Sequence, residues 1–123
     1  MKRNVVILAV MSVCIALVVT GCQKKDTSAI KIGVAGAHSG DLASYGLPSV
    51  NAAKLVAEAI NAKGGINGRK IELVIEDDQC KPELATNAAS KLVSSNVVAV
   101  IGHICSGATK SALGIYKDSK IVT

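Results

Sequence analysis

From Ile30 onward, the pattern of apolar and polar positions alternates between strand-like and helix-like segments. The strand-like runs, rich in branched aliphatic residues, are 30–36, 70–76, 97–101 and a partial run at 120–123. The helix-like segments, with apolar residues at three- and four-residue steps, are 48–62, 82–94 and 106–118. Each crossover is long enough to join parallel strands, so the pattern predicts a doubly wound α/β fold with a parallel sheet.

The expected ends of these elements follow from local residue types. Residues 37–46 are rich in Gly, Ser and Asp and are expected to be a loop. Pro48 suits the first turn of the helix that follows, where a missing N–H costs nothing. Gly64 and Gly65 end that helix. The run 97–101 is apolar without alternation, as expected for a strand covered by helices on both faces.

The first 22 residues have the features of an export signal. A basic head, Met1 to Asn4, precedes an apolar run from Val5 to Val19 that is interrupted only by Ser12. These 15 residues are too few to span a membrane, which takes about 20. The sequence therefore predicts a secretory signal peptide.

The end of this run resembles the bacterial lipobox, in which an aliphatic residue and two small residues precede a lipidated cysteine. Here the four residues are Val-Thr-Gly-Cys at 19–22. The resemblance implies a lipoprotein signal peptide at 1–21, lipidation of Cys22 and a polar, lipid-anchored linker at 22–29. The alternatives are a plain signal peptide with a chance cysteine and an uncleaved anchor.

Charge and aromatic content bear on the class of partner. The chain has 14 basic and 9 acidic residues, and loss of Lys2 and Arg3 with the signal peptide leaves 12 basic residues. The positive charges are scattered, and Tyr45 and Tyr116 are the chain's aromatic residues. Nucleic-acid binding needs a clustered basic surface or stacking rings, so the sequence indicates no nucleic-acid partner.

Two cysteines remain after removal of the signal and assignment of Cys22 to the lipid. An even pair in an exported chain, Cys80 and Cys105, favours a disulfide, with two separate buried thiols as the alternative. Two cysteines cannot form a structural zinc site, and His38 and His103 lack metal-ligand spacing. No metal site is predicted.

In an open α/β sheet, ligands bind beyond the carboxyl ends of the strands. The loops expected at that edge are 37–46, 77–81 and 103–107. Ser106 suits the N-cap of the following helix, whose free N–H groups attract an anion such as a carboxylate. A role as a helix cap alone is the alternative. Tyr45 suits the wall of a pocket, and a partly buried loop aromatic is its alternative.

The acidic and histidine residues give no sign of catalysis. Asp77 and Asp78 are adjacent, so in an extended chain they point opposite ways, and a solvated loop is expected there. His103 is expected to be structural or superficial. No nucleophile motif surrounds any serine, and neither a dinucleotide fingerprint nor a phosphate loop is present. The sequence predicts a protein that is not an enzyme and needs no cofactor.

An ordered series of segments resembles the leucine/isoleucine/valine-binding proteins of bacterial branched-chain amino-acid transport, which have the type I periplasmic binding fold. The segments are 30–40, 45–46, 60–68, 77–80 and 100–106. The resemblance extends over residues 30–123. It implies a substrate-binding protein of an ABC importer, working with permease and ATPase subunits. The alternatives are a ligand-sensing receptor of the same fold and a binding protein for amides or urea-like compounds.

The resemblance also implies roles for individual residues. Cys80 and Cys105 would form a disulfide, Ser106 would bind the carboxylate of an amino-acid ligand, and Tyr45 would line its side-chain end. Gly107 stands where some relatives carry a hydroxyl residue, so its contribution would come from the backbone alone.

The family has two lobes that close on the ligand around a hinge. Residues 30–123 are expected to be an incomplete N-terminal lobe, because the second lobe and the acid that meets the ligand ammonium would lie beyond them. The mature segment alone, residues 22–123, is therefore expected to fold poorly and to bind amino acids weakly or not at all.

Overall fold

Three parallel strands form the centre of the structure, a computed structural model that describes residues 27–123. They are β1 (Ile30–Gly36), β2 (Ile71–Asp77) and β3 (Ala99–Ile101), in the spatial order β2-β1-β3. Val122 adds a parallel bridge beside Ala99. The predicted parallel sheet is confirmed, whereas the predictions for residues 1–21 and Cys22 lie outside the described residues.

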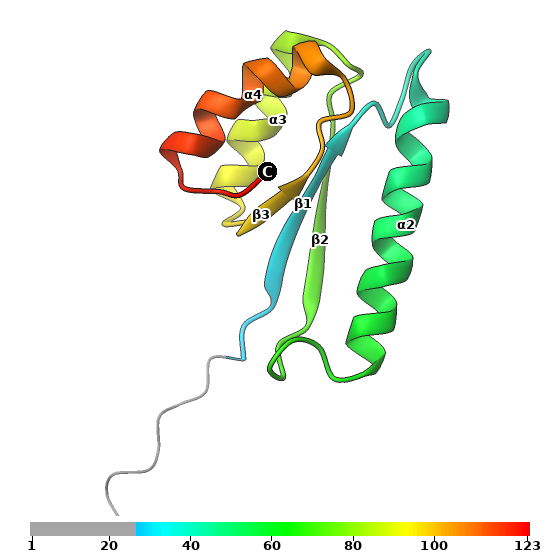
Figure 1. Cartoon of the computed structure of the whole chain (residues 1–123), viewed down its shortest axis with the longest axis vertical. Coiled ribbons are helices and arrows are strands. Elements are labelled where there is room, and N and C mark those ends of the chain that lie inside the picture. The colour runs from blue at the N-terminus through cyan, green and yellow to red at the C-terminus, as the bar shows by residue number, and fades with distance from the viewer. Residues whose placement is uncertain (1–26) are drawn as a thin grey trace, which may run out of the picture.

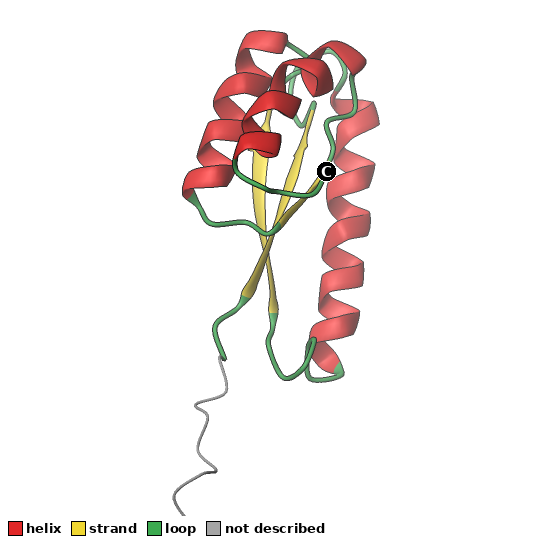
Figure 2. Ribbon diagram, turned by 60° about the vertical axis from the view of Figure 1, so that its left-hand side comes forward, coloured by secondary structure: helices red, strands yellow, loops and turns green. Residues whose placement is uncertain are grey.

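Helices cover both faces of this sheet (Figure 1). They are α2 (Ala43–Ala62), α3 (Pro82–Ser94) and α4 (Ser106–Asp118). Figure 2 shows α2 on one side, with α3 and α4 together on the other. This arrangement is the predicted doubly wound α/β fold. Among residues 27–123, no helix is both long and apolar enough to cross a membrane.

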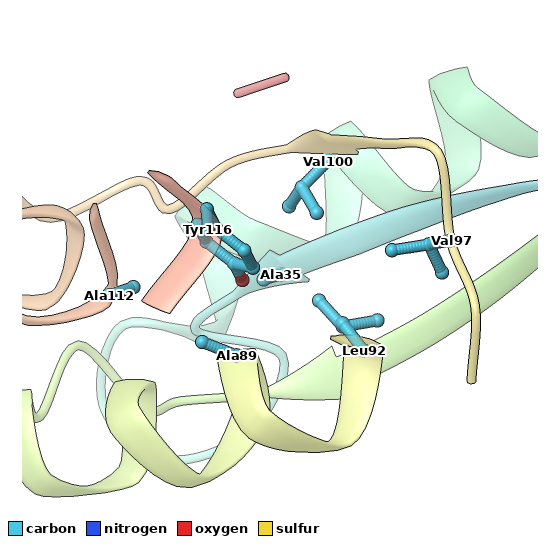
Figure 3. Close-up of a cluster of buried hydrophobic side chains, with 7 residues drawn as sticks. All are labelled: Ala35, Ala89, Leu92, Val97, Val100, Ala112 and Tyr116. Carbon is cyan, nitrogen blue, oxygen red and sulfur yellow. The ribbon is translucent and has the colours of Figure 1, made fainter. Parts of the chain in front are cut away.

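The hydrophobic core lies between the sheet and the α3–α4 pair (Figure 3). Leu92 of α3 is fully buried, and Gly33 of β1 gives it room to approach the sheet. A Cβ at Gly33 would lie 3.0 Å from Leu92 Cδ2 and 3.0 Å from Val100 Cγ2. The core is small because alanines, including Ala89 and Ala112, fill much of it and let the helices approach closely.

The α2 side of the sheet is more open. An apolar groove of about 500 Å³ lies along it, lined among others by Ala53, Val56, Leu73 and Ile101. The residues Val56 and Ile101 remain 59% and 49% exposed. The expectation that strand 97–101 is covered on both faces was wrong for the described part of the chain, because α2 packs on β2 and β1 and leaves β3 uncovered.

The start of α2 differs from the prediction. The helix begins at Ala43, so Pro48 is its sixth residue and 43–46 is helical rather than part of a loop. Pro48 therefore removes one intrahelical hydrogen bond. Close packing decides this start: Gly46 is buried, and a Cβ there would lie 1.8 Å from the Ala37 carbonyl oxygen.

Gly46→Ala is expected to lower the free energy of unfolding by about 1–3 kcal/mol, because the backbone at Ala37 must move to admit the methyl group. Gly114→Ala is the matched control. Gly114 also lies inside a helix, but nothing lies within 4 Å of its would-be Cβ. The control is expected to be neutral or stabilising by up to about 1 kcal/mol. Urea denaturation measures both, and equal effects would contradict the assigned contact.

Candidate functional site

Three loops meet at the carboxyl edge of the sheet. The β1–α2 loop follows Gly36, the β2–α3 loop follows Asp77, and the β3–α4 loop follows Ile101. Because all three strands are parallel, their carboxyl ends share one edge, where ligands of open α/β folds bind. The sequence placed its candidate residues at this edge, and the structure does the same.

Asp77 holds the β1–α2 loop. Its Oδ1 accepts hydrogen bonds from the His38 N–H at 2.8 Å and the Gln79 N–H at 3.0 Å, and its Oδ2 accepts one from the Ser39 hydroxyl. Burial acts to raise the pKa of Asp77, but these hydrogen bonds outweigh it and lower the pKa below its ordinary 3.8. The carboxylate therefore stays ionised while it organises the loop.

Asp78 holds the β3–α4 loop and is fully buried. Its carboxylate contacts His103 Nδ1 at 2.5 Å and accepts the Cys80 N–H at 2.7 Å. The expectation of a solvated loop at Asp77 and Asp78 was wrong for Asp78, because a partner 25 residues away makes its burial tolerable. The expectation that the two acids point opposite ways is confirmed by their different partners.

His103 continues this buried chain to α4. Its Nε2 lies 2.9 Å from the Tyr116 hydroxyl, and both residues are buried. Burial, followed by the negative charge of Asp78, raises the pKa of Tyr116 to about 12. The phenol therefore remains protonated at neutral pH. His103 is structural, which was one of the two expectations, and it is not superficial.

A disulfide joins the β2–α3 loop to the β3–α4 loop. Cys80 and Cys105 are bonded, with Cα atoms 5.3 Å apart and 25 residues between them in sequence. In the chain-entropy model, a loop of this length is worth roughly 3–4 kcal/mol. The pairing implied by the family resemblance is present, and the alternative of two separate thiols is excluded by the structure.

The sequence suggested Ser106 as the N-cap of the third helix. In the structure, Ser106 is instead the first residue of α4. Cys105 is the N-cap, in extended conformation and without a side-chain capping bond. The first helical bond runs from the Thr109 N–H to the Cys105 carbonyl, so the N–H groups of Ser106 and Gly107 precede the hydrogen-bonded turns. Both residues are exposed, and these donors lie open at the edge of the sheet.

Tyr45 lies in the first turn of α2, with 70% of its surface exposed. It belongs to a helix and is well exposed, so the alternative of a partly buried loop aromatic was wrong. Tyr45 and Ser106 thus stand at the starts of two helices that lead away from the same edge of the sheet (Figure 1).

His38 also belongs to this edge. Its backbone is held by Asp77, and both of its ring nitrogens are buried without a hydrogen-bond partner among the described residues. Within residues 27–123, no three His, Cys, Asp or Glu side chains converge as metal ligands would. The polar atoms of the edge thus include helix-start N–H groups, hydroxyls, the Asp77 carboxylate and one unpaired imidazole.

Comparison with known proteins identifies the family. A model described as periplasmic binding protein matches residues 29–123. The chain belongs to the periplasmic binding protein family. A Leu/Ile/Val-binding protein from Escherichia coli K12 is 40% identical over 114 residues, which are 93% of this chain and 30% of that protein. An amino acid binding protein from Pseudomonas aeruginosa is 40% identical over 122 residues, 98% of this chain and 31% of that protein.

A solved structure agrees with the sequence relatives. The branched-chain amino acid transporter substrate binding protein of Streptococcus pneumoniae, in complex with isoleucine, superposes with a TM-score of 0.72 at 38% identity. The match covers 76% of this chain and 27% of that one. This periplasmic binding protein chain therefore spans less than a third of the length of these relatives. The names of all three describe binding proteins rather than enzymes.

The Asp78–His103–Tyr116 chain of this periplasmic binding protein was missed by sequence reasoning, although one signal points to it. Tyr116 falls on the same helical stripe as Ala108 and Ala112, at steps of four residues, and all three are buried. A buried tyrosine needs a hydrogen-bond partner for its hydroxyl. The aspartate that follows β2 and the histidine that follows β3 were the available candidates.

Asp77→Asn tests the role of the carboxylate in the β1–α2 loop. A group with a lowered pKa stabilises the fold above its unfolded pKa, about 3.9, and loses that effect as the pH falls through the lower folded value. The variant should unfold at a lower temperature than wild type at pH 6, and the difference should shrink below about pH 4. Circular dichroism melts from pH 2.5 to pH 7 measure it.

Asp41→Asn is the control, because Asp41 is an exposed carboxylate of the same region without a hydrogen bond among the described residues. It should produce little change at any pH in that range. If the thermal midpoints of wild type and Asp77→Asn differ by the same amount at every pH, the charge of Asp77 does not contribute to the stability of the fold.

Proposed function

We propose that this chain belongs to an extracytoplasmic substrate-binding lipoprotein of an ABC importer that takes up branched-chain amino acids or close analogues. Leucine, isoleucine and valine are named for the E. coli relative, and the S. pneumoniae structure holds isoleucine. The proposal extends these ligands to this protein. Permease and ATPase subunits are the proposed partners. The protein would deliver ligand without catalysing a reaction and without a cofactor.

The observation that carries this proposal is the open start of α4. The N–H groups of Ser106 and Gly107 are free of helical bonds, and the Ser106 hydroxyl has no partner among the described residues. A helix start carries about half a positive charge, which favours a carboxylate. Every α-amino acid has that carboxylate, so this edge supports recognition of the common part of the ligand.

Gly107 fits a role through its backbone alone. A Cβ at this position would lie 3.7 Å from Pro82 Cγ, an ordinary contact, so a side chain is not excluded by space. Its absence leaves the N–H accessible to a ligand. Tyr45, exposed at the start of α2, is the proposed contact for the side-chain end of the ligand.

The buried groups support binding rather than catalysis. His103 and Asp78 have side chains 1% and 0% exposed, and both are bonded within the fold. They therefore cannot activate the Ser106 hydroxyl on the surface. No described base lies bonded to that hydroxyl, which a nucleophilic serine would need.

Lipid anchoring at Cys22 would hold the domain at the membrane face, where importer subunits lie. Residues 22–29 would be the tether and residues 30–123 a part of the N-terminal lobe. The open apolar groove beside α2 supports the proposal that residues 30–123 are only part of a lobe, because a complete lobe buries such apolar surfaces.

A ligand panel on the full-length protein tests the proposal. Leucine, isoleucine or valine at 100 times its Kd should stabilise the fold by about 2.7 kcal/mol, seen as a rise in the thermal midpoint. Stabilisation by amides, urea-like compounds or aromatic acids alone would replace the proposed ligand class. If the protein binds these amino acids but its gene has no neighbouring permease and ATPase genes, a ligand-sensing receptor is favoured over an importer component.

Ser106→Ala should weaken leucine binding about tenfold to a hundredfold, since hydrogen bonds to charged groups are worth about 1.5–3 kcal/mol. Ser111→Ala is the matched control. Ser111 lies on the same helix, but its hydroxyl bonds the Gly107 carbonyl within the helix. Titration calorimetry compares the two, and equal losses would argue against Ser106 as a ligand contact.

Cys22→Ser tests the anchor. The wild-type protein should partition with membranes and carry the mass of acyl chains on its first residue, whereas the variant should keep its signal peptide or appear without acylation. Fractionation followed by intact mass measurement decides this. A wild-type mass equal to the unmodified polypeptide would remove the anchor from the proposal.

A further inference from the structure

Three buried polar side chains link the end of β2, the β3–α4 loop and the body of α4. Asp78 contacts His103 Nδ1 at 2.5 Å, and His103 Nε2 lies 2.9 Å from the Tyr116 hydroxyl. Asp78 is 0% exposed, Tyr116 1% and His103 8%. Their burial leaves them no direct contact with a ligand at the edge, so any effect on binding is transmitted through the backbone.

The two ring nitrogens of His103 face different partners. Nδ1 pairs with the carboxyl group of Asp78, and Nε2 pairs with the hydroxyl of Tyr116. Each member thereby has a partner, which removes the penalty for burying polar groups.

The network is more specific than a hydrophobic contact of the same volume. Apolar side chains would fill the space at least as favourably, but they lack the directed hydrogen bonds that fix the β3–α4 loop in one orientation. Helical side chains tilt toward the helix N-terminus, so the Tyr116 hydroxyl reaches back to His103, three residues before Ser106. The Thr109 hydroxyl adds a bond to the His103 carbonyl at 2.9 Å.

We propose that Asp78, His103 and Tyr116 are positioning residues that hold the first N–H groups of α4 in the orientation that binds a ligand carboxylate. The inference rests on the proposed function, because it presumes a carboxylate ligand at Ser106 and Gly107. The disulfide fixes Cys105, the residue before Ser106, to the β2–α3 loop. Two residues earlier, the contact with Asp78 fixes His103. The short segment between them leads directly into the binding groups.

Binding of leucine and of leucinamide to the full-length protein separates positioning from simple stability. Leucinamide keeps the side chain and ammonium group but lacks the carboxylate. Tyr116→Phe removes one hydroxyl, and His103→Asn keeps a donor toward Asp78 but cuts the link to Tyr116. Both should raise the Kd for leucine, by about tenfold for His103→Asn, while the Kd for leucinamide changes less than about twofold.

Val97→Ala is the control for destabilisation. Val97 belongs to the same core but lies before β3, at the opposite end from the binding edge. It should lower the thermal midpoint and leave the ratio of the two Kd values unchanged. If the ligand panel identifies another amino acid, the same comparison uses that acid and its amide, with the wild-type Kd values as the reference.

The outcomes distinguish the two proposals. Positioning is supported if the ratio of the Kd for leucinamide to the Kd for leucine falls in Tyr116→Phe and His103→Asn but not in Val97→Ala. Unchanged ratios, in a wild-type protein that binds leucine, overturn the positioning role and leave the proposed function intact. A folded wild-type protein that binds no carboxylate ligand overturns both. Tyr116→Phe keeps the test valid if His103→Asn does not fold, because it removes one buried atom only.

Discussion

The opposite orientation of Asp77 and Asp78 at the end of β2 determines how the loops of the binding edge are held. Successive side chains of an extended chain point to opposite faces of a sheet. Asp77 therefore binds the β1–α2 loop through His38 and Ser39, while Asp78 binds the β3–α4 loop through His103. One strand end thus fixes the loops that follow both other strands.

This arrangement requires the β3–α4 loop to approach across the end of β1, which lies between β2 and β3. Gly36 makes the approach possible, because a Cβ there would lie 2.9 Å from Ile104 Cδ1. The Asp78 N–H in turn bonds the Gly36 carbonyl at 2.9 Å. A residue without a side chain at the end of the central strand is therefore part of the same construction as the two carboxylates.

Hydrophobic periodicity predicted the elements well, because helices and strands of this fold bury continuous faces. It predicted α3 and α4 with their observed bounds. It failed where tertiary packing decides: α2 begins five residues before Pro48 because Gly46 packs on Ala37. Asp78 was expected in solvent because local polarity says nothing about a histidine 25 residues away. Local signals locate a site, but its internal bonds depend on the partners that the fold supplies.

The starts of α4 and α2 differ in how much each can contribute to ligand recognition. The α4 start offers a fixed set of donors, but a helix dipole attracts any small anion and does not distinguish leucine from another acid. Tyr45 is 70% exposed, so the described residues alone do not enclose an apolar side chain. In the proposed site, the buried network and the disulfide would make carboxylate binding precise in geometry. Selection among amino acids would then depend on surfaces that close over Tyr45, which is the expected division of labour when a ligand is held between two lobes.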